Sequence, residues 1–336
     1  MTIKISNDFT QYVKILGRGK KGARSLTVEE AEHAMSLMLI GKVASEQLGA
    51  FWMLIRIREE TVEETVGFTK ATRQYLAEKE ALNVKVDLDW PSYAGKRNEL
   101  PWFLLAALAL ANNGLNIVMH GHAFTGEERI YVDEAIKGLG LPICHSRVEI
   151  KQRLHQTGFA YISLENIEPA LGELMDLKYM LGLRSPVNTV VRMMNPFAAD
   201  HSVHGVFHRG YDDLHVAACE QLNDPSVLVF RGGNGEAEVN PERDVTLLKW
   251  QGGVASQISW PKAEKEHKRL KHNLDLSRLT DHWSGEQVDQ FGEQAVRQTL
   301  ASVAGLIYGV ASHDECLILA DEIWFKRNKG WLSQTT

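Results

Sequence analysis

The sequence predicts an α/β protein with a small all-helical domain and a larger α/β domain that carries a mostly parallel sheet. Only helical patterns and helix-capping signals occur in the first 80 residues, whereas short strand-like runs alternate with helical stretches after residue 82. A chain of 336 residues, 44% hydrophobic and 24% charged, is also long enough for two domains with a large core. We therefore predict a helical domain over residues 1–80 and an α/β domain over 81–336.

Helical periodicity and capping residues predict four helices in the first domain. Two of them begin with the capping box, in which a threonine hydroxyl and a glutamate three residues later satisfy each other's amides: Thr27 with Glu30, and Thr61 with Glu64. Ser45 is the expected cap of a third. The expected helices are 9–16, 28–40, 46–58 and 62–78.

The predicted helix 46–58 is apolar on nearly every face, so it needs burial on several sides. Its apolar residues are Leu48, Phe51, Trp52, Met53, Leu54, Ile55 and Ile57. Either it is the central core helix of the domain, or part of it forms a homodimer contact; the sequence leaves both open.

In the second domain the expected strands lie in "LNVKVDLD", "LNIVMHG", "LPICHS", "FAYISL", "VHGVFH", "SVLVFRGG" and "VTLLKW", and two helices, 286–308 and 314–327, end the chain. The longest apolar run, 100–111, is shorter than the roughly 20 residues of a membrane span. The N-terminus has no secretory apolar segment, so we expect a soluble, cytoplasmic protein. The three scattered cysteines, Cys144, Cys219 and Cys316, suit reduced, buried thiols rather than a metal site or disulfides.

Charge is segregated along the chain, although the net charge is −6. Residues 14–24 carry five cations and no anion, residues 178–192 carry three and none, and residues 262–271 carry a net three. Each run is either a solvated helix face or part of a local positive field that attracts a polyanion.

The stretch "LDWPSYAGKRNELPWFLLAAL", residues 88–108, predicts an anion site. It reads as a strand, a loop and a helix, an order that points backbone amides and the positive helix end at a ligand. Gly95, Lys96 and Arg97 lie just before the helix, which Pro101 helps to start.

Several further motifs give the chain a resemblance to a known family. "VMHG", "LGLRSPVNTVVRMMNP" and "VLVFRGGNGEAEVN" resemble, in order and spacing, the anthranilate phosphoribosyltransferases of glycosyltransferase family 3. "LGRGKKGARSLTVEEA" and "DWPSYAGKR" are similar to a divergent YbiB-type subgroup of nucleic-acid-binding homodimers without the parent activity. The resemblance implies a nucleoside phosphorylase/phosphoribosyltransferase-like fold, a cleft between the domains, and a dimer contact in the helical domain joined by residues 167–185.

The resemblance also implies what catalysis requires: a glycine-rich loop around the pyrophosphate of phosphoribosyl pyrophosphate, hydroxyl donors in the next helix, and an Asp-Glu pair on magnesium. At the loop position this chain has Pro91, Ser92, Tyr93, Ala94 and Gly95. The proline has no amide proton and the side chains prevent close backbone approach. Phe103 and Leu104 take the hydroxyl positions and donate nothing.

Three further positions depart from the enzymes. Ala237 replaces the metal-binding aspartate, which leaves Glu236 and Glu238 as weak metal candidates. Lys178 replaces an arginine and Arg192 a proline of the acceptor channel, and an ammonium cannot make a bidentate contact. We therefore predict that the parent activity is lost, that no catalytic residue is identifiable, and that no cofactor is needed; magnesium enters only if the chain is an active family 3 pentosyltransferase.

The predicted function is sequence-nonspecific binding of single-stranded nucleic acid by a homodimer. The expected phosphate contacts are Arg18, Lys20, Lys21, Arg24, Lys96, Arg97, Lys178, Arg184, Arg192 and Arg209. Trp90, Tyr93 and Trp102 offer surfaces for base stacking, although Trp102 equally suits the core. The basic segment 17–24 is either a phosphate track or a solvated loop. The alternatives are a family 3 enzyme, favoured by the two glutamates, and a protein-interaction scaffold.

The histidines invite a separate hypothesis. His201, His204, His208 and His215 lie within fifteen residues, yet on a strand only positions 204 and 208 share a face, so a zinc site is disfavoured. His208 with Arg209 instead suits phosphate contacts. For His120, at the "HG" turn, we predict a structural hydrogen bond.

Overall fold

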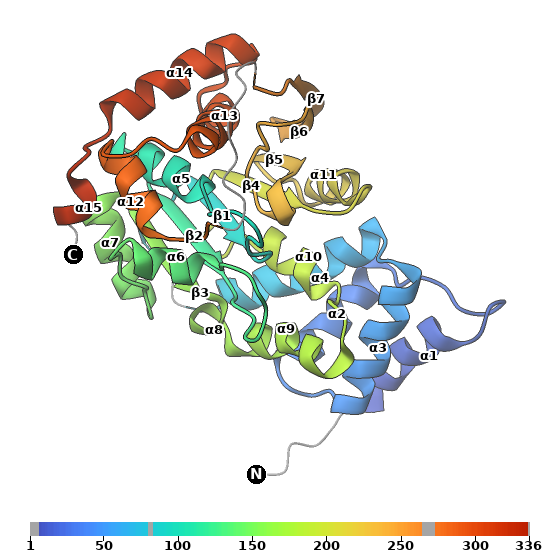
Figure 1. The fold of residues 1–336 in the computed structure, drawn as a ribbon. Coiled ribbons are helices and arrows are strands. Elements are labelled where there is room, and N and C mark those ends of the chain that lie inside the picture. The colour runs from blue at the N-terminus through green and yellow to red at the C-terminus, as the bar shows by residue number, and fades with distance from the viewer. Residues whose placement is uncertain (1–6, 80–82, 264–272, 335–336) are drawn as a thin grey trace.

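The computed structural model describes residues 7–79, 83–263 and 273–334. It confirms the predicted fold class, with an N-terminal helical bundle beside an α/β domain (Figure 1). The strands are β1 (Leu88–Ser92), β2 (Ile117–Gly121), β3 (Phe159–Ser163), β4 (His201–Val206), β5 (Ser226–Arg231), β6 (Val245–Gln251) and β7 (Val254–Trp260). The helices are α1 (Thr10–Gly17), α2 (Val28–Leu39), α3 (Ser45–Arg58), α4 (Val62–Ala77), α5 (Phe103–Asn112), α6 (Val132–Gly138), α7 (Arg147–Thr157), α8 (Leu164–Ile167), α9 (Pro169–Leu181), α10 (Val187–Met193), α11 (Tyr211–Leu222), α12 (Ser277–Ser284), α13 (Gln290–Tyr308), α14 (His313–Lys326) and α15 (Trp331–Gln334).

Within the described residues the strands form one seven-stranded sheet in the order β3-β2-β1-β4-β5-β6-β7. The pairs from β3 to β5 are parallel, and β6 and β7 add an antiparallel hairpin. The strand predicted in "LPICHS" is wrong: only an isolated bridge between Cys144 and Ile162 forms there. β7 was not predicted, because most of its side chains are exposed and only Ile258 and Trp260 at its end follow the apolar alternation of a half-buried strand.

The helical bundle is built on an aromatic core from α3 and α4. Trp52 packs edge-to-face against Phe51 and Phe68, with ring centroids 5.1 and 5.3 Å apart. Leu171 and Met175 of α9 belong to the same hydrophobic cluster, so this helix packs onto the bundle.

Both predicted capping boxes are present, at Thr27 with Glu30 and at Thr61 with Glu64. The cap predicted at Ser45 is wrong, because Ser45 is already the first residue of α3. There the Gln47 side chain accepts from the Ala44 amide instead.

The α/β domain has its largest core on α5, whose residues 103–111 are all buried. α5 and α13 share one hydrophobic cluster with the central strands, and α14 packs outside them (Figure 1). In the described part of the chain no single helix is long and apolar enough to cross a membrane; α13 and α14 pass that test only as a pair bent by 104°. Cys144, Cys219 and Cys316 are free and buried, as predicted.

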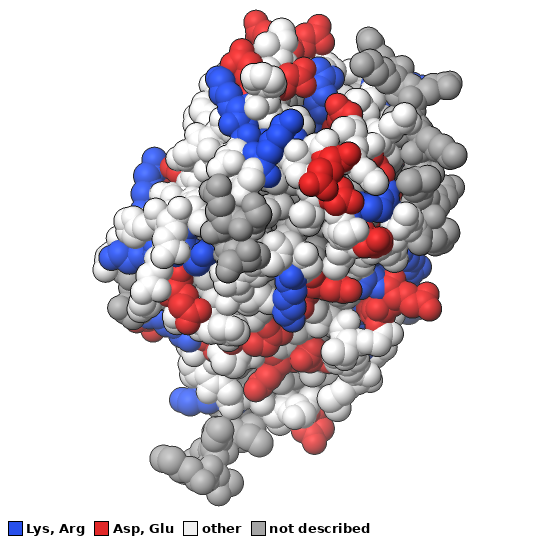
Figure 2. All heavy atoms as spheres, turned by 60° about the vertical axis from the view of Figure 1, so that its left-hand side comes forward, with Lys and Arg blue, Asp and Glu red and all other residues white. Residues whose placement is uncertain are grey.

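The surface carries both signs of charge. On the face shown in Figure 2, Lys and Arg side chains alternate with Asp and Glu, and no continuous track of one sign crosses it.

Candidate anion-binding site

The loop after β1 is closed by a carboxylate of the chain itself. Glu236 Oε1 accepts hydrogen bonds from the backbone amides of Ala94, at 2.8 Å, and Gly95, at 2.6 Å. The Glu236 backbone is packed directly against two glycines, which leave room for it because they have no Cβ. A Cβ at Gly232 would lie 1.7 Å from the Glu236 carbonyl oxygen, and one at Gly205 would lie 2.2 Å from its carbonyl carbon. The amides predicted to face an external anion are therefore already used. Pro91 and Ser92 lie in β1 rather than in the predicted loop.

A second internal carboxylate occupies the start of α5. Glu238 Oε2 accepts from the Phe103 amide at 2.9 Å, and its Oε1 pairs with the Lys96 ammonium. Lys96 is 0% exposed and also lies 3.6 Å from Glu99. The prediction that Lys96 binds phosphate is wrong, because its ammonium is buried and paired with Glu238 inside the protein. We call Glu236 and Glu238 the internal carboxylates.

The aromatic side chains of this loop are buried rather than available to bases. Trp90, Tyr93 and Trp102 are at most 2% exposed, so the stacking prediction is wrong and Trp102 belongs to the core. The Tyr93 hydroxyl lies 2.5 Å from His120 Nδ1, and His120 Nε2 lies 3.0 Å from Asp89. The structural role predicted for His120 is confirmed.

Beside this closed loop lies a cavity of about 360 Å³ between the bundle and the α/β domain, which we call the inner cavity. It is bordered by α3, α10, the segment between α9 and α10, and the loop after β4. Its charged lining residues are Arg56, Glu60, Arg129, Lys178, Arg184 and Arg192. Three of these cations were predicted; Arg56 and Arg129 were not, because each lies outside the basic runs of the sequence.

A larger outer cavity, of about 1080 Å³, adjoins the inner one and shares Arg129, Lys178 and Arg184 with it. Arg97 lines only the outer cavity, which also carries Glu127, Glu128 and Glu134. Positive charge in the outer cavity is thus nearly balanced, whereas Glu60 is the single carboxylate that lines the inner one within the described residues.

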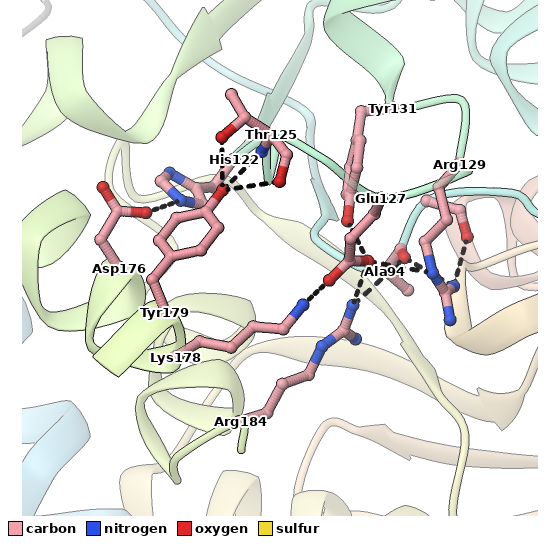
Figure 3. Close-up of polar contacts among 11 residues, drawn as sticks. Ala94, His122, Thr125, Glu127, Arg129, Tyr131, Asp176, Lys178, Tyr179 and Arg184 are labelled. Carbon is pink, nitrogen blue, oxygen red and sulfur yellow. Dashed lines mark hydrogen bonds and ion pairs between the residues drawn. The ribbon is translucent and has the colours of Figure 1, made fainter. Parts of the chain in front are cut away.

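Glu127 forms ion pairs with the three cations that the two cavities share (Figure 3). Its carboxylate pairs with Lys178, lies 3.2 Å from Arg129 Nε and 3.8 Å from Arg184, and accepts from the Tyr131 hydroxyl at 2.8 Å. Lys178 and Arg184 also lie over the Phe124 ring, at 4.1 and 5.5 Å from its centroid. These side chains are held in place rather than mobile.

Arg192 differs from the other predicted contacts because it is buried, with 9% of its surface exposed. It donates to the Asn188 carbonyl at 2.5 Å and lies 5.8 Å from the centroid of the Tyr93 ring. Burial lowers the pKa of its guanidinium to about 10, so the group is still charged at neutral pH. Arg192 is therefore a fixed cation on the wall of the inner cavity.

The remaining predicted contacts lie outside the inner cavity. Arg18, Lys20 and Lys21 are exposed on the loop after α1, which projects from the edge of the bundle (Figure 1). Arg24, on the same loop, is held by both oxygens of Glu30, at 2.6 and 2.7 Å. Arg209 is exposed beside the inner cavity but does not line it. Most of the third basic run lies outside the described residues, at 264–272.

The histidines do not converge on one point. His204 and His215 face each other at 3.2 Å between their Nδ1 atoms, and both are buried. Burial, with a smaller contribution from Arg192, lowers the pKa of His215 to about 3 and keeps it neutral. No group of three potential His, Cys, Asp or Glu ligands in the described residues is placed to hold a metal ion. His208 lines the inner cavity.

The N-terminal domain and the overall fold of this chain are those of a known class of transferases. Residues 10–75 match the helical bundle domain of the glycosyl transferase family. The chain superposes on anthranilate phosphoribosyltransferase from Thermus thermophilus with a TM-score of 0.76 and 18% identity, over 98% of both chains. The TM-score with the Saccharomyces cerevisiae enzyme in complex with PRPP and Mg is 0.79, at 16% identity, over 98% of this chain and 97% of that one. The chain has the fold of the anthranilate phosphoribosyltransferases and a glycosyl transferase family 3 N-terminal domain.

Sequence comparison then places the chain among two kinds of relative. It is 24% identical over 260 residues to anthranilate phosphoribosyltransferase of Salinibacter ruber, which covers 76% of this chain and 73% of that protein. It is 26% identical over 252 residues to the uncharacterized protein YbiB of Escherichia coli, which covers 73% of this chain and 78% of that protein. The chain is thus a homologue of both.

The residues present here do not fit a magnesium-bound diphosphate. The internal carboxylates are engaged with Ala94, Gly95, Phe103 and Lys96, and Ala237 between them offers no ligand atom in its side chain. A diphosphate at this loop would meet negative charge instead of amide donors.

Proposed function

We propose that this protein binds single-stranded nucleic acid on a phosphoribosyltransferase scaffold that has lost the parent transferase activity. The observation that carries the proposal is the engagement of the loop amides and of the α5 N-terminus by the internal carboxylates. A transferase needs those donors for the departing pyrophosphate. With the donors taken, the remaining cationic groups suit a different phosphate ligand.

The cations available for a phosphate backbone lie in two places. Arg97 and Arg184 line the outer cavity, and Lys20 and Lys21 are exposed on the loop after α1. Contacts of this kind recognise phosphate without regard to base sequence and weaken as salt rises. Phe207, which is 62% exposed at the rim of the inner cavity, offers a ring for base stacking in place of the buried tryptophans.

The proposed protein is a homodimer joined through α1 and α3. Ile57 is 79% exposed, and it lines with Val13, Met53 and Leu54 an apolar groove of about 590 Å³ between these helices. Apolar surface gathered on one face of a small domain is typical of an interface. The loop after α1 carries Arg18, Lys20 and Lys21, and we call it the basic loop. A second copy that covers the groove would bring the basic loops of both subunits into one assembly.

A fluorescence anisotropy titration with a labelled single-stranded oligonucleotide tests the binding. We expect micromolar or tighter affinity at about 50 mM salt, and a loss of tenfold or more at about 200 mM as counterion release becomes less favourable. Because no metal takes part, a chelator should leave the affinity unchanged. Absence of binding at low salt would end the proposal.

A charge-reversal pair tests the basic loop. Lys20→Glu with Lys21→Glu should weaken binding about tenfold for all base sequences alike, because phosphate contacts carry no sequence information. The matched control is Lys137→Glu with Lys151→Glu, which makes the same change in net charge at exposed positions of α6 and α7. An equal loss in both pairs would point to net charge rather than to this loop.

A family 3 transferase remains the second candidate, and its support is the relationship to enzymes at 24–27% identity. Binding of the sugar donor with magnesium separates it from the first candidate.

A further inference from the structure

Two guanidinium groups of the inner cavity have no carboxylate partner in the part of the chain that the structure describes. Within the described residues, no carboxylate oxygen lies within 4.0 Å of Arg56 or Arg192 nitrogens, whereas Arg129, Lys178 and Arg184 share Glu127. Glu60, the acid that lines this cavity, is occupied by the Thr189 hydroxyl at 2.8 Å and the Tyr211 hydroxyl at 3.2 Å. Arg192 is buried and Arg56 is half-buried, and a buried cation without a carboxylate partner is costly, so an anionic ligand would lower that cost.

The same cavity holds a buried acceptor without a donor. Asn188 Oδ1 has no hydrogen-bond partner among the described residues, while the amide nitrogen of the same side chain donates to the Ser185 carbonyl at 3.3 Å, which fixes its orientation. Asn188 is only 9% exposed. Buried polar atoms are nearly always paired, so a ligand here must bring a donor as well as negative charge.

The rim adds an apolar ring to these polar groups. Phe207 lines the inner cavity and is 62% exposed, with His208 edge-on to its ring at 5.1 Å between centroids. A ligand that fits this cavity carries negative charge, a hydrogen-bond donor and a flat ring that can stack on Phe207. A nucleotide has all three features, whereas inorganic phosphate has no ring.

We propose that the inner cavity binds one nucleoside monophosphate unit, with its phosphomonoester on Arg192 and Arg56 and a sugar or base donor on Asn188 Oδ1. The unit is either a free nucleotide or the terminal nucleotide of a strand; the second source rests on the proposed function and the first does not. At about 360 Å³ the cavity is at the lower end of the roughly 300–1,000 Å³ of small-molecule sites, so it holds one unit and not a chain.

Three oligonucleotides of one sequence, with a 5′-phosphate, a 3′-phosphate or hydroxyls at both ends, and free thymidine 5′-monophosphate test this site. A terminal phosphate bound by the strand-end route should raise affinity about tenfold over the hydroxyl form, as expected for charge-assisted contacts to a guanidinium. By the free route, the mononucleotide should raise Tm and compete with the phosphorylated strand. If the three strands bind equally and the mononucleotide changes nothing, the inference is overturned while nucleic-acid binding stands.

The opposite failure is separable. If no strand binds but the mononucleotide raises Tm, the inference holds and the proposed function fails.

Arg192→Met assigns the effect to this residue. It removes a buried charge that has no carboxylate partner among the described residues, so Tm without ligand should stay the same or rise, while the preference for a terminal phosphate and the mononucleotide effect should disappear. Arg192→Lys, which keeps the charge but not the planar fork, should retain part of both. The control is Arg327→Met, which removes an equally buried arginine that donates to the Trp283 and Trp324 carbonyls away from the cavity. Ligand effects that persist in Arg192→Met would contradict the assignment, and the wild-type titrations decide the proposal even if this variant fails to fold.

Discussion

At the scale of the residue, Glu236 and Glu238 determine what the loop after β1 can bind. Helix N-termini and glycine-containing loops attract anions because their amides are unpaired. Here one carboxylate serves Ala94 and Gly95 and the other serves Phe103 and Lys96. The anion of this site is therefore part of the protein.

This arrangement makes Glu236 a stabilising residue. Glu236→Ala should lower the free energy of unfolding by about 2–4 kcal/mol, because two buried amides lose their acceptor. Glu236→Gln keeps an oxygen and should cost less. Chemical denaturation measures both, with Glu220→Ala on the exposed face of α11 as the control. Equal stability of all three variants would show that the amides find other partners.

A second residue-scale prediction concerns His122, which joins the segment after β2 to α8 and α9. Its ring lies 2.5 Å from Glu165 and 2.9 Å from Asp176, the contact seen in Figure 3. Burial opposes the charged form, but hydrogen bonds and attraction from Glu165 and then Asp176 outweigh it and raise the pKa of His122. A histidine whose pKa is raised in the folded state stabilises the fold fully at pH values below its unfolded pKa, about 6.5. This stabilisation is lost as the pH rises through the pKa of the folded state.

His122→Gln should therefore lower the free energy of unfolding by about 0.5–1 kcal/mol near pH 6, since both carboxylates are half-exposed and screened by water. The difference from wild type should shrink near pH 9. Denaturant titrations at the two pH values measure it. A difference that grows with pH would contradict the protonated pair.

Among the helices and strands, sequence patterns predict an element correctly where the residues that fix it are close together in the chain. Thr61 and Glu64 fix the start of α4 because the capping box is local in the chain. Local patterns failed where partners are distant: Pro91 and Ser92 continue β1 because β2 pairs with them, at a position where proline and glycine neighbours predict a loop. β7 is likewise held by β6 rather than by its own apolar pattern.

The apolar groove between α1 and α3 leads to a prediction at the same scale. Ile57→Glu should convert a dimer to a monomer in sedimentation or light-scattering measurements, because it places a charge in the proposed interface. Phe325→Glu is the control, since Phe325 is 83% exposed on α14. A wild-type monomer at tens of micromolar would contradict the dimer.

At the scale of the whole molecule, the inner cavity shows why the site was only partly predictable. Lys178, Arg184 and Arg192 lie within one basic run, so composition revealed them. Arg56 comes from the bundle and Arg129 from the segment after β2, and only the packing of the two domains brings them together. The phosphate contact predicted for Lys96 failed for a related reason, because its partner Glu238 is 142 residues away in the sequence.

The internal carboxylates use the donors that the shared fold places at this loop. The fold supplies the strand, loop and helix of a phosphate site, and function depends on which groups occupy them. Glu236 and Glu238 occupy them here, whereas Arg56 and Arg192 of the inner cavity have no carboxylate partner among the described residues, and Lys20 and Lys21 are exposed on the loop after α1.

Calorimetry with phosphoribosyl pyrophosphate and magnesium tests this account most directly. The internal carboxylates predict no measurable heat of binding at the loop of Ala94 and Gly95, under conditions in which a single-stranded oligonucleotide binds. A clear saturable heat that requires magnesium and is lost on Glu238→Gln would show that the donor site is intact, and it would contradict the account.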